Sequence, residues 1–301
     1  MNESANLGSG QRDAIHDVHE RRPSPLLARH VVCTWIQTVS PRSTAFTHRK
    51  APNGSVEIVC VPGSIPRVLG PQTGPIEEAL APGTTIVGVR LRPEAAASVL
   101  GMPAPTLRDL AVDADELWGD RARALQELLG SATSDQQVAA HLERAVAERL
   151  AGAPAPDPVV AQAVQLLLSG RRAGVAALAS VLCISERQLR RRFEGATGLT
   201  PTTLHRILRF QRFLALAWTR ARPSTQIGRL AVEAGYADQA HLSREAARLE
   251  GRSPRSFLSE SELRCGCGHD HSASYAPLLR HRAQGLRTMG AAGFEPATSR
   301  V

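Results

Sequence analysis

Three arginines in one short segment have the residue type and spacing to bind nucleic acid. Arg187, Arg190 and Arg191 stand at positions i, i+3 and i+4 of the sequence SERQLRRRFEG, so on a helix they share one face. A guanidinium group can donate two hydrogen bonds to a guanine edge or grip a phosphate. Arginines in the first turns of a helix oppose the helix dipole, so this arrangement gains little for helix stability alone. We predict that these arginines, together with Gln188, contact DNA.

The surrounding sequence predicts a helix-turn-helix unit that would present these side chains. Ser185 followed by Gln188 forms a capping box, which places the start of a helix at Glu186. Leu189 and Phe193, four residues apart, mark the side of this helix that should be buried. The preceding run VAALASVL predicts a first helix, which a short turn joins to the second.

The same pattern occurs a second time further along the chain. Leu178-Ala179 recurs as Leu230-Ala231 at an offset of 52, and other positions recur at an offset of 53: Leu189, Arg191, Gly198 and Pro201 return as Leu242, Arg244, Gly251 and Pro254. The difference predicts a turn one residue longer in the second copy. Asp238 is its expected N-cap, and the polar side chains predicted to contact DNA are Gln239, His241, Ser243 and Arg244. This set is poorer in arginine, so we expect it to make more backbone contact; His241 could equally be a capping or surface residue.

A connecting helix is predicted between the two units. The run TTLHRILRFQRFLALAW has a stripe of residues at helical spacing that should be buried and hold the two units at a fixed separation: Leu204, Ile207, Leu208, Gln211, Leu214, Ala215 and Trp218. Arg206, Arg209 and Arg212 of this helix are candidates for phosphate contacts, and a solvated charged face is the alternative.

Charge is distributed unevenly along the 301 residues. The chain has a net charge of +8, but residues 1–158 carry 15 basic and 18 acidic side chains, residues 159–262 carry 16 and 8, and residues 263–301 carry 5 and 2. A basic surplus confined to one segment of domain size suggests a nucleic-acid partner for that segment. No apolar run approaches the roughly 20 residues of a membrane-spanning helix, and the polar start lacks the core of a secretion signal, so we expect a cytoplasmic protein with no membrane partner.

The fold class predicted is an α+β N-terminal domain, with strands first and then helices, followed by an all-α domain of two helix-turn-helix subdomains joined by a linker helix. Strands are predicted at VVCTWIQTV, SVEIVCV and TTIVGVRL, and helices follow after Pro93. The stretch AGAPAPDP cannot continue a helix. The predicted divisions are a flexible N-terminus at 1–22, a sensor or oligomerisation domain at 23–150, a linker at 151–158, a DNA-binding domain at 159–262 and a flexible tail at 263–301.

The segment from about Val159 to Leu258 resembles the DNA-binding domain of AraC/XylS-type transcriptional regulators. The residues that carry the resemblance fall in both copies: Leu178-Ala179, Ser185, Leu189, Phe193, Gly198-Leu199-Thr200-Pro201, Arg209, Ile227, Leu230-Ala231, Ala234-Gly235-Tyr236, Asp238-Gln239, His241-Leu242-Ser243-Arg244, Gly251, Ser253-Pro254 and Phe257. The resemblance implies a regulator controlled by a ligand or partner. It also implies base contacts from Arg187, Arg190 and Arg191 in the first unit and from Gln239, His241, Ser243 and Arg244 in the second. Leu242, Ala246 and Glu250 depart from the family pattern, which usually has aromatic residues there.

The front half resembles an N-terminal domain of unknown function that precedes such DNA-binding domains in some bacterial relatives. The matching pieces are Pro52-Asn53-Gly54 with Val56-Glu57-Ile58-Val59, Gly70-Pro71-Gln72-Thr73, Pro82-Gly83-Thr84, Val87 to Pro93, and Leu117-Trp118-Gly119. The resemblance implies a module that senses a small-molecule effector or forms a homodimer, and not a known catalytic module. No cofactor is implied, and double-stranded operator DNA is the expected partner.

Two other hypotheses compete with that of a regulator controlled through its N-terminal domain. Cys265, Cys267, His269 and His271 form a dense Cys/His cluster in the tail, which would suit a metal-sensing regulator, although structural zinc sites usually have wider spacings. An enzyme that transfers alkyl groups from DNA would need Cys33 or Cys60 as nucleophile, and both lie in apolar runs where cysteine is usually buried. Residues from Gln284 to Val301 resemble the translated remnant of a transfer-RNA gene and are excluded from fold reasoning.

Overall fold

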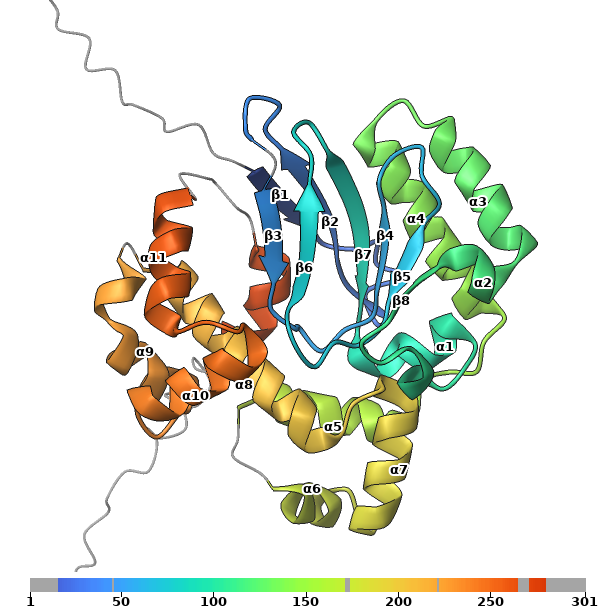
Figure 1. Ribbon diagram of the computed structural model, residues 1–301. Coiled ribbons are helices and arrows are strands. Elements are labelled where there is room, and N and C mark those ends of the chain that lie inside the picture. The colour runs from blue at the N-terminus through green and yellow to red at the C-terminus, as the bar shows by residue number, and fades with distance from the viewer. Residues whose placement is uncertain (1–15, 45, 171–173, 221, 265–270, 280–301) are drawn as a thin grey trace, which may run out of the picture.

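The computed structural model describes residues 16–44, 46–170, 174–220, 222–264 and 271–279. A sheet-rich N-terminal domain precedes a helical C-terminal region (Figure 1). The strands are β1 (His16–Arg21), β2 (Val31–Val39), β3 (Phe46–Lys50), β4 (Glu57–Cys60), β5 (Arg67–Leu69), β6 (Ile76–Leu80), β7 (Thr85–Leu91) and β8 (Ala111–Asp113). None of the helices in the described part of the chain is long and apolar enough to cross a membrane.

The strands form an antiparallel sheet of order β1-β2-β7-β4-β5-β8 and a separate ribbon of β3 and β6. The short helices η1 (Pro93–Ala95), α1 (Ala96–Leu100), η2 (Ala104–Leu107) and α2 (Ala114–Trp118) lead to the longer α3 (Asp120–Gly130) and α4 (Asp135–Ala151). Helix α4 packs on β2 and β7 and buries one face of the sheet, and the ribbon lies beyond the opposite face (Figure 1). This opposite face carries a small cluster around Trp35 and Ile86.

The predicted order of strands followed by helices is confirmed. The N-terminal segment and the tail differ from expectation. Residues 16–21 are a strand because β1 pairs along its whole length with β2, and residues 272–279 are helical. Leu278 of this second segment is buried in the core of the helical region, and Ser274 donates hydrogen bonds to Glu20, so tertiary contacts order residues that look featureless in the sequence.

The helical region begins at Pro158. Its elements are α5 (Pro158–Leu168), α6 (Val175–Val181), α7 (Glu186–Thr197), α8 (Pro201–Trp218), η3 (Pro223–Thr225), α9 (Ile227–Ala234), α10 (Gln239–Leu249) and α11 (Pro254–Arg264). One apolar core runs through the α-helices of this region, with α8 at its centre. The predicted buried stripe of α8 is confirmed except at Trp218, which is 46% exposed and meets the ring of Tyr275 edge-on at 6.1 Å between centroids.

Candidate nucleic-acid interface

Helices α6 and α7 form the first helix-turn-helix unit, and α9 and α10 form the second. The turns repeat the same hydrogen bonds: Ile184 N donates to Ala179 O at 3.1 Å, and Tyr236 N donates to Ala231 O at 2.9 Å. These bonds satisfy carbonyl groups at the end of the first helix of each pair. The N-caps are Ser185 and Asp238, so the second turn contains one residue more, as the change of offset predicts.

The two turns reach their shared geometry with different residues. Cys183 has φ of 54° and Gly235, at the equivalent position, has φ of 97°. Glycine adopts this left-handed backbone without a side-chain clash, whereas cysteine does so at a cost. The first turn is therefore strained at an exposed residue.

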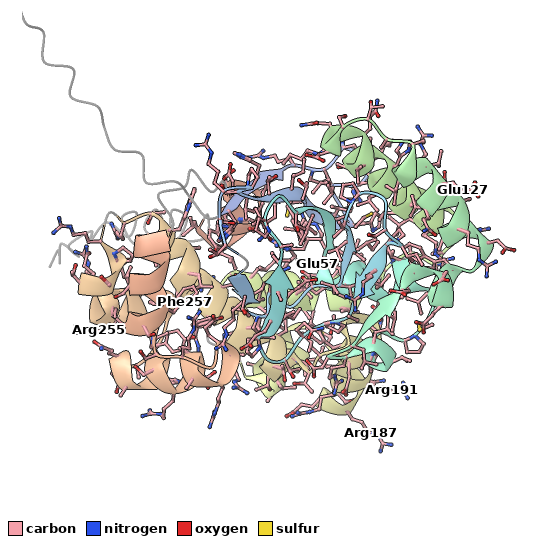
Figure 2. The ribbon with its side chains drawn as sticks, turned by 45° about the horizontal axis from the view of Figure 1, so that its top comes forward. Glu57, Glu127, Arg187, Arg191, Arg255 and Phe257 are labelled. Carbon is pink, nitrogen blue, oxygen red and sulfur yellow. The ribbon has the colours of Figure 1, made fainter. Side chains whose placement is uncertain are left out.

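Helix α7 presents the predicted arginines to solvent. Arg187, Gln188, Arg190 and Arg191 are all exposed, and Figure 2 shows Arg187 and Arg191 pointing away from the protein. Ser185 and Gln188 complete the capping box, so the start of the helix is fixed as predicted. Glu186 in the first turn pairs with Arg190 at 2.9 Å and offsets part of the unfavourable interaction with the helix dipole.

Helix α10 presents a smaller polar set. Gln239 and Arg244 are exposed, while His241 and Ser243 are half-buried. The His241 ring stands edge-on to the buried Tyr236 at 5.3 Å, and Ser243 Oγ donates to the carbonyl of Gln239 at 2.9 Å. Two of the four predicted side chains therefore already have partners within the domain.

The three arginines of α8 also have partners within the protein. Arg206 Nε donates to Glu245 Oε2 at 2.8 Å, and Glu245 is a buried residue in the middle of α10. Arg209 lies over the Tyr236 ring at 4.5 Å and 3.9 Å from the same carboxylate. Burial would raise the pKa of Glu245, but its hydrogen bond and charge interaction with Arg206 and the charge of Arg209 lower it. Arg212 donates to the carbonyls of Leu168 and Leu278 at 2.6 and 3.3 Å, and the phosphate assignment of the three stays a prediction.

The N-terminal domain is attached to both helix-turn-helix units by arginines that the sequence reasoning missed. Arg108 donates to the carbonyl of Gly198 at 2.7 Å and to Glu194 at 2.6 Å, both at the end of α7. Arg49 of the β3–β6 ribbon donates to the carbonyl of Glu250 at 2.9 Å, after α10. No local pattern marks these arginines, because their partners lie 90 and 201 residues away.

The linker is a third point of attachment. Asp157 accepts two hydrogen bonds from Arg192 of α7, at 2.6 and 2.7 Å, and also caps the start of α5. The hydrogen bond from Arg192 lowers the pKa of Asp157. Arg192 therefore holds the linker against α7, whereas its neighbour Arg191 is exposed to solvent.

The remaining candidates divide into buried cysteines and the tail cluster. Burial raises the pKa of Cys33 to about 12 and that of Cys60 to about 11, so both thiols are protonated at neutral pH and inaccessible in the sheet. Cys265, Cys267 and His269 lie outside the described residues, and His271 lies 3.4 Å from Glu20. Within the described ranges, no three potential ligands gather as a metal site.

Comparison with known families agrees with the two-part architecture. Residues 178–260 match the model of a helix-turn-helix domain. This region is an AraC-type helix-turn-helix domain. Residues 19–113 match a domain of unknown function, DUF6597, which precedes the AraC-type domain in this chain. The AraC-type domain supports a DNA-binding transcriptional regulator.

The solved structures that match this chain are distant. ToxT from Vibrio cholerae is 9% identical over 81% of this chain and 97% of its own, with a TM-score of 0.40. Wild-type ToxT with a bound unsaturated fatty acid is 12% identical over 81% and 94%, with a TM-score of 0.39. The AraC-like transcriptional activator CuxR is 15% identical over 69% and 88%, with a TM-score of 0.19. No curated protein matches the chain, and TM-scores this low transfer neither ligand nor function to it.

Proposed function

We propose that this protein is a sequence-specific DNA-binding transcriptional regulator that reads bases mainly with α7. The observation that carries the proposal is the outer face of this helix, where Arg187, Gln188, Arg190 and Arg191 are all exposed next to a fixed N-cap. Exposed arginines on a helix that fits the major groove can bond guanine edges and phosphates. The AraC-type domain supports the same proposal.

The second unit has a supporting role in this proposal. Helix α10 contributes Gln239 and Arg244 to DNA directly, and His241 and Ser243 would have to exchange their internal partners for DNA. The two helices would enter successive major grooves, about one helical turn (~34 Å) apart on one DNA face. Most base discrimination then falls to α7, and α10 adds mainly backbone contacts.

The proposal is tested with an operator selected from random-sequence DNA by the full chain. Arg190→Ala and Arg191→Ala should each weaken operator binding by about 1–3 kcal/mol and relax the preference at one base pair. Arg123→Ala on α3 is the matched control, because Arg123 is exposed and pairs with Asp120 of its own helix, as Arg190 does with Glu186. Unaltered operator affinity in an Arg190/Arg191 double variant would contradict the assignment of the reading helix.

We also propose that a ligand or partner at the N-terminal domain controls DNA binding. Arg108 and Arg49 support this role, because they bond the domain to the ends of both reading helices. A change in the N-terminal domain would therefore alter how α7 and α10 are held. A homodimeric state is part of the same hypothesis, and sedimentation of the full chain with and without operator DNA tests it.

A further inference from the structure

Residues 271–279, here called the latch, lie between the N-terminal sheet and helix α8 (Figure 1). On the sheet side, the backbone N–H and the hydroxyl of Ser274 both donate to Glu20 of β1 at 2.8 Å, and Ala273 packs against the small apolar cluster of the sheet. On the other side, Leu278 is buried in the core of the helical region. The latch therefore contacts both domains.

The second half of α8 provides the contacts of the latch with the helical region. The Trp218 ring meets the Tyr275 ring edge-on, with 6.1 Å between the centroids. Arg212 Nε donates to the carbonyl of Leu278 at 3.3 Å, and Arg212 Nη2 donates to the carbonyl of Leu168 on α5 at 2.6 Å. Because α8 joins the two helix-turn-helix units, the docked latch helps to fix the helix that sets their separation.

The latch has little helical stability by itself. Residues 272–279 are helical, and Pro277 lies inside this run. Proline has no backbone N–H, so the usual hydrogen bond to the carbonyl of Ala273, four residues earlier, cannot form. A short helix with such a gap is marginal in water and depends on packing against other elements. Folding of the latch is therefore coupled to its docking.

Glu20 connects the latch to a second contact between the N-terminal domain and α8. It pairs with Arg90 at 3.0 Å, and Arg90 pairs with Glu57 at 2.6 Å. Glu57 accepts a hydrogen bond from Asn53 at 2.7 Å. The residue before Asn53 accepts a hydrogen bond through its carbonyl from Gln211 of α8, at 2.8 Å. The docked latch is thus one end of a polar network whose other end also holds α8.

The latch also forms one side of a cavity between the two domains. This cavity has a volume of about 710 Å³ and is lined by His271, Ser274 and Tyr275 of the latch, together with Trp35 of the sheet and Phe257 of α11. Release of the latch would open the cavity on this side.

We propose that the latch opens and closes as a unit. When closed it folds onto Glu20 and α8, and when open it leaves both while the two domains stay folded. DNA that engages both helix-turn-helix units at one separation favours the closed form, because α8 is then fixed. Only this effect of DNA rests on the proposed function.

Hydrogen–deuterium exchange of the full chain without DNA, followed by mass spectrometry, tests the opening of the latch. The amides of residues 274–279 should exchange about tenfold or more slowly than in the free peptide HSASYAPLL, and about tenfold or more faster than those in the centre of α8. Exchange at the rate of the free peptide would show that the latch does not dock. Exchange at the rate of α8 would show that it opens only when the domain unfolds, and either result would overturn the proposal.

Two variants test the contacts that hold the latch. Ser274→Ala removes a hydrogen bond to the sheet and Leu278→Ala empties a site in the helical core, so each should raise the exchange rate of the latch by about fivefold or more. Ser180→Ala on α6 and Leu128→Ala on α3 are matched controls, because both side chains are exposed. Unchanged exchange in both latch variants, with normal thermal melting, would overturn the assignment of these contacts.

Operator DNA then tests the link between the latch and DNA reading. Saturating operator should slow exchange in the wild-type latch by about threefold or more, because opening the latch then costs binding energy. An unchanged rate with operator bound would overturn this link. If no operator can be selected, the proposed function fails, whereas the exchange measured without DNA still decides whether the latch opens.

Discussion

Arg108 of the N-terminal domain donates a hydrogen bond from Nε to the carbonyl of Gly198, 2.7 Å away at the end of α7. The same guanidinium group reaches Glu194 at 2.6 Å. One side chain thus fixes the carboxyl end of α7, whose amino end carries the exposed arginines. The N-terminal domain and α7 are therefore in direct contact.

We expect Arg108→Ala to weaken the coupling between the two domains. The change removes a hydrogen bond to a carbonyl, worth about 1 kcal/mol, and a partly exposed ion pair that contributes little because of solvent screening. Urea unfolding followed by intrinsic fluorescence should show a lower midpoint and a transition that separates into two steps. Arg123→Ala should leave the curve unchanged, and a single unshifted transition in Arg108→Ala would show that the contact does not couple the domains.

The buried ion pairs of Glu57 with Lys50 and Arg90 should be lost in acid, and the stability of the folded protein should fall with them. Burial would raise the pKa of Glu57, but the charges of Lys50 and Arg90 and their hydrogen bonds lower it from 4.5 to about 2. Because the folded pKa lies below the unfolded one, this stabilisation is present above about pH 4.5 and is lost as the pH falls towards 2. It amounts to roughly 3 kcal/mol at most.

Glu57→Gln tests this prediction. The difference in unfolding free energy between the wild-type protein and the variant, measured by urea titration, should shrink steadily between pH 5 and pH 2. Glu127→Gln is the control, because Glu127 is exposed on α3, far from Glu57 in Figure 2. A difference that stays constant with pH would show that Glu57 is not the group that titrates.

Cys183→Gly should stabilise the first helix-turn-helix unit. Cys183 is exposed and has a left-handed backbone, while the second unit has Gly235 at the equivalent position. Relief of this strain should raise stability by roughly 0.5–1 kcal/mol, after allowance for the greater freedom of glycine when unfolded. Thermal melting measures the effect, and Cys183→Ala separates loss of the thiol from relief of the backbone. Equal melting temperatures for the glycine and alanine variants would refute the strain.

The arginines of α8 should separate into two roles. Arg209 is 17% exposed at its side chain and stacks on Tyr236, so Arg209→Met should lower stability and leave the salt dependence of DNA binding unchanged. Arg206 is 34% exposed, so Arg206→Met should reduce the slope of log affinity against log salt by about 0.9, the value for one phosphate contact. Fluorescence anisotropy over a salt series measures both, and an unchanged slope for Arg206→Met would remove it from the phosphate contacts.

Local patterns in the sequence determined strand β2 and the exposed face of α7. The β-branched content of VVCTWIQTV placed β2 at its observed bounds, and the N-cap residues Ser185 and Asp238, together with the repeat, placed α7 and α10 to within a residue. The exposed position of Arg187, Arg190 and Arg191 followed from the helical period relative to Leu189 and Phe193. Apart from the repeat, which recurs at offsets of 52 and 53, these features depend on residues close together in the chain, so a single sequence contains them.

Only the tertiary structure decided what brings distant segments together. Three features join residues from different elements: the pairing of Arg206 with Glu245, the hydrogen bond from Arg108 to Gly198, and the cavity that Trp35 helps to line. The helix at residues 272–279 is held by Glu20 and by the core around α8, more than 50 residues away in each case. Such contacts depend on how elements pack, and neither hydrophobic period nor capping specifies which buried partner a particular arginine will find.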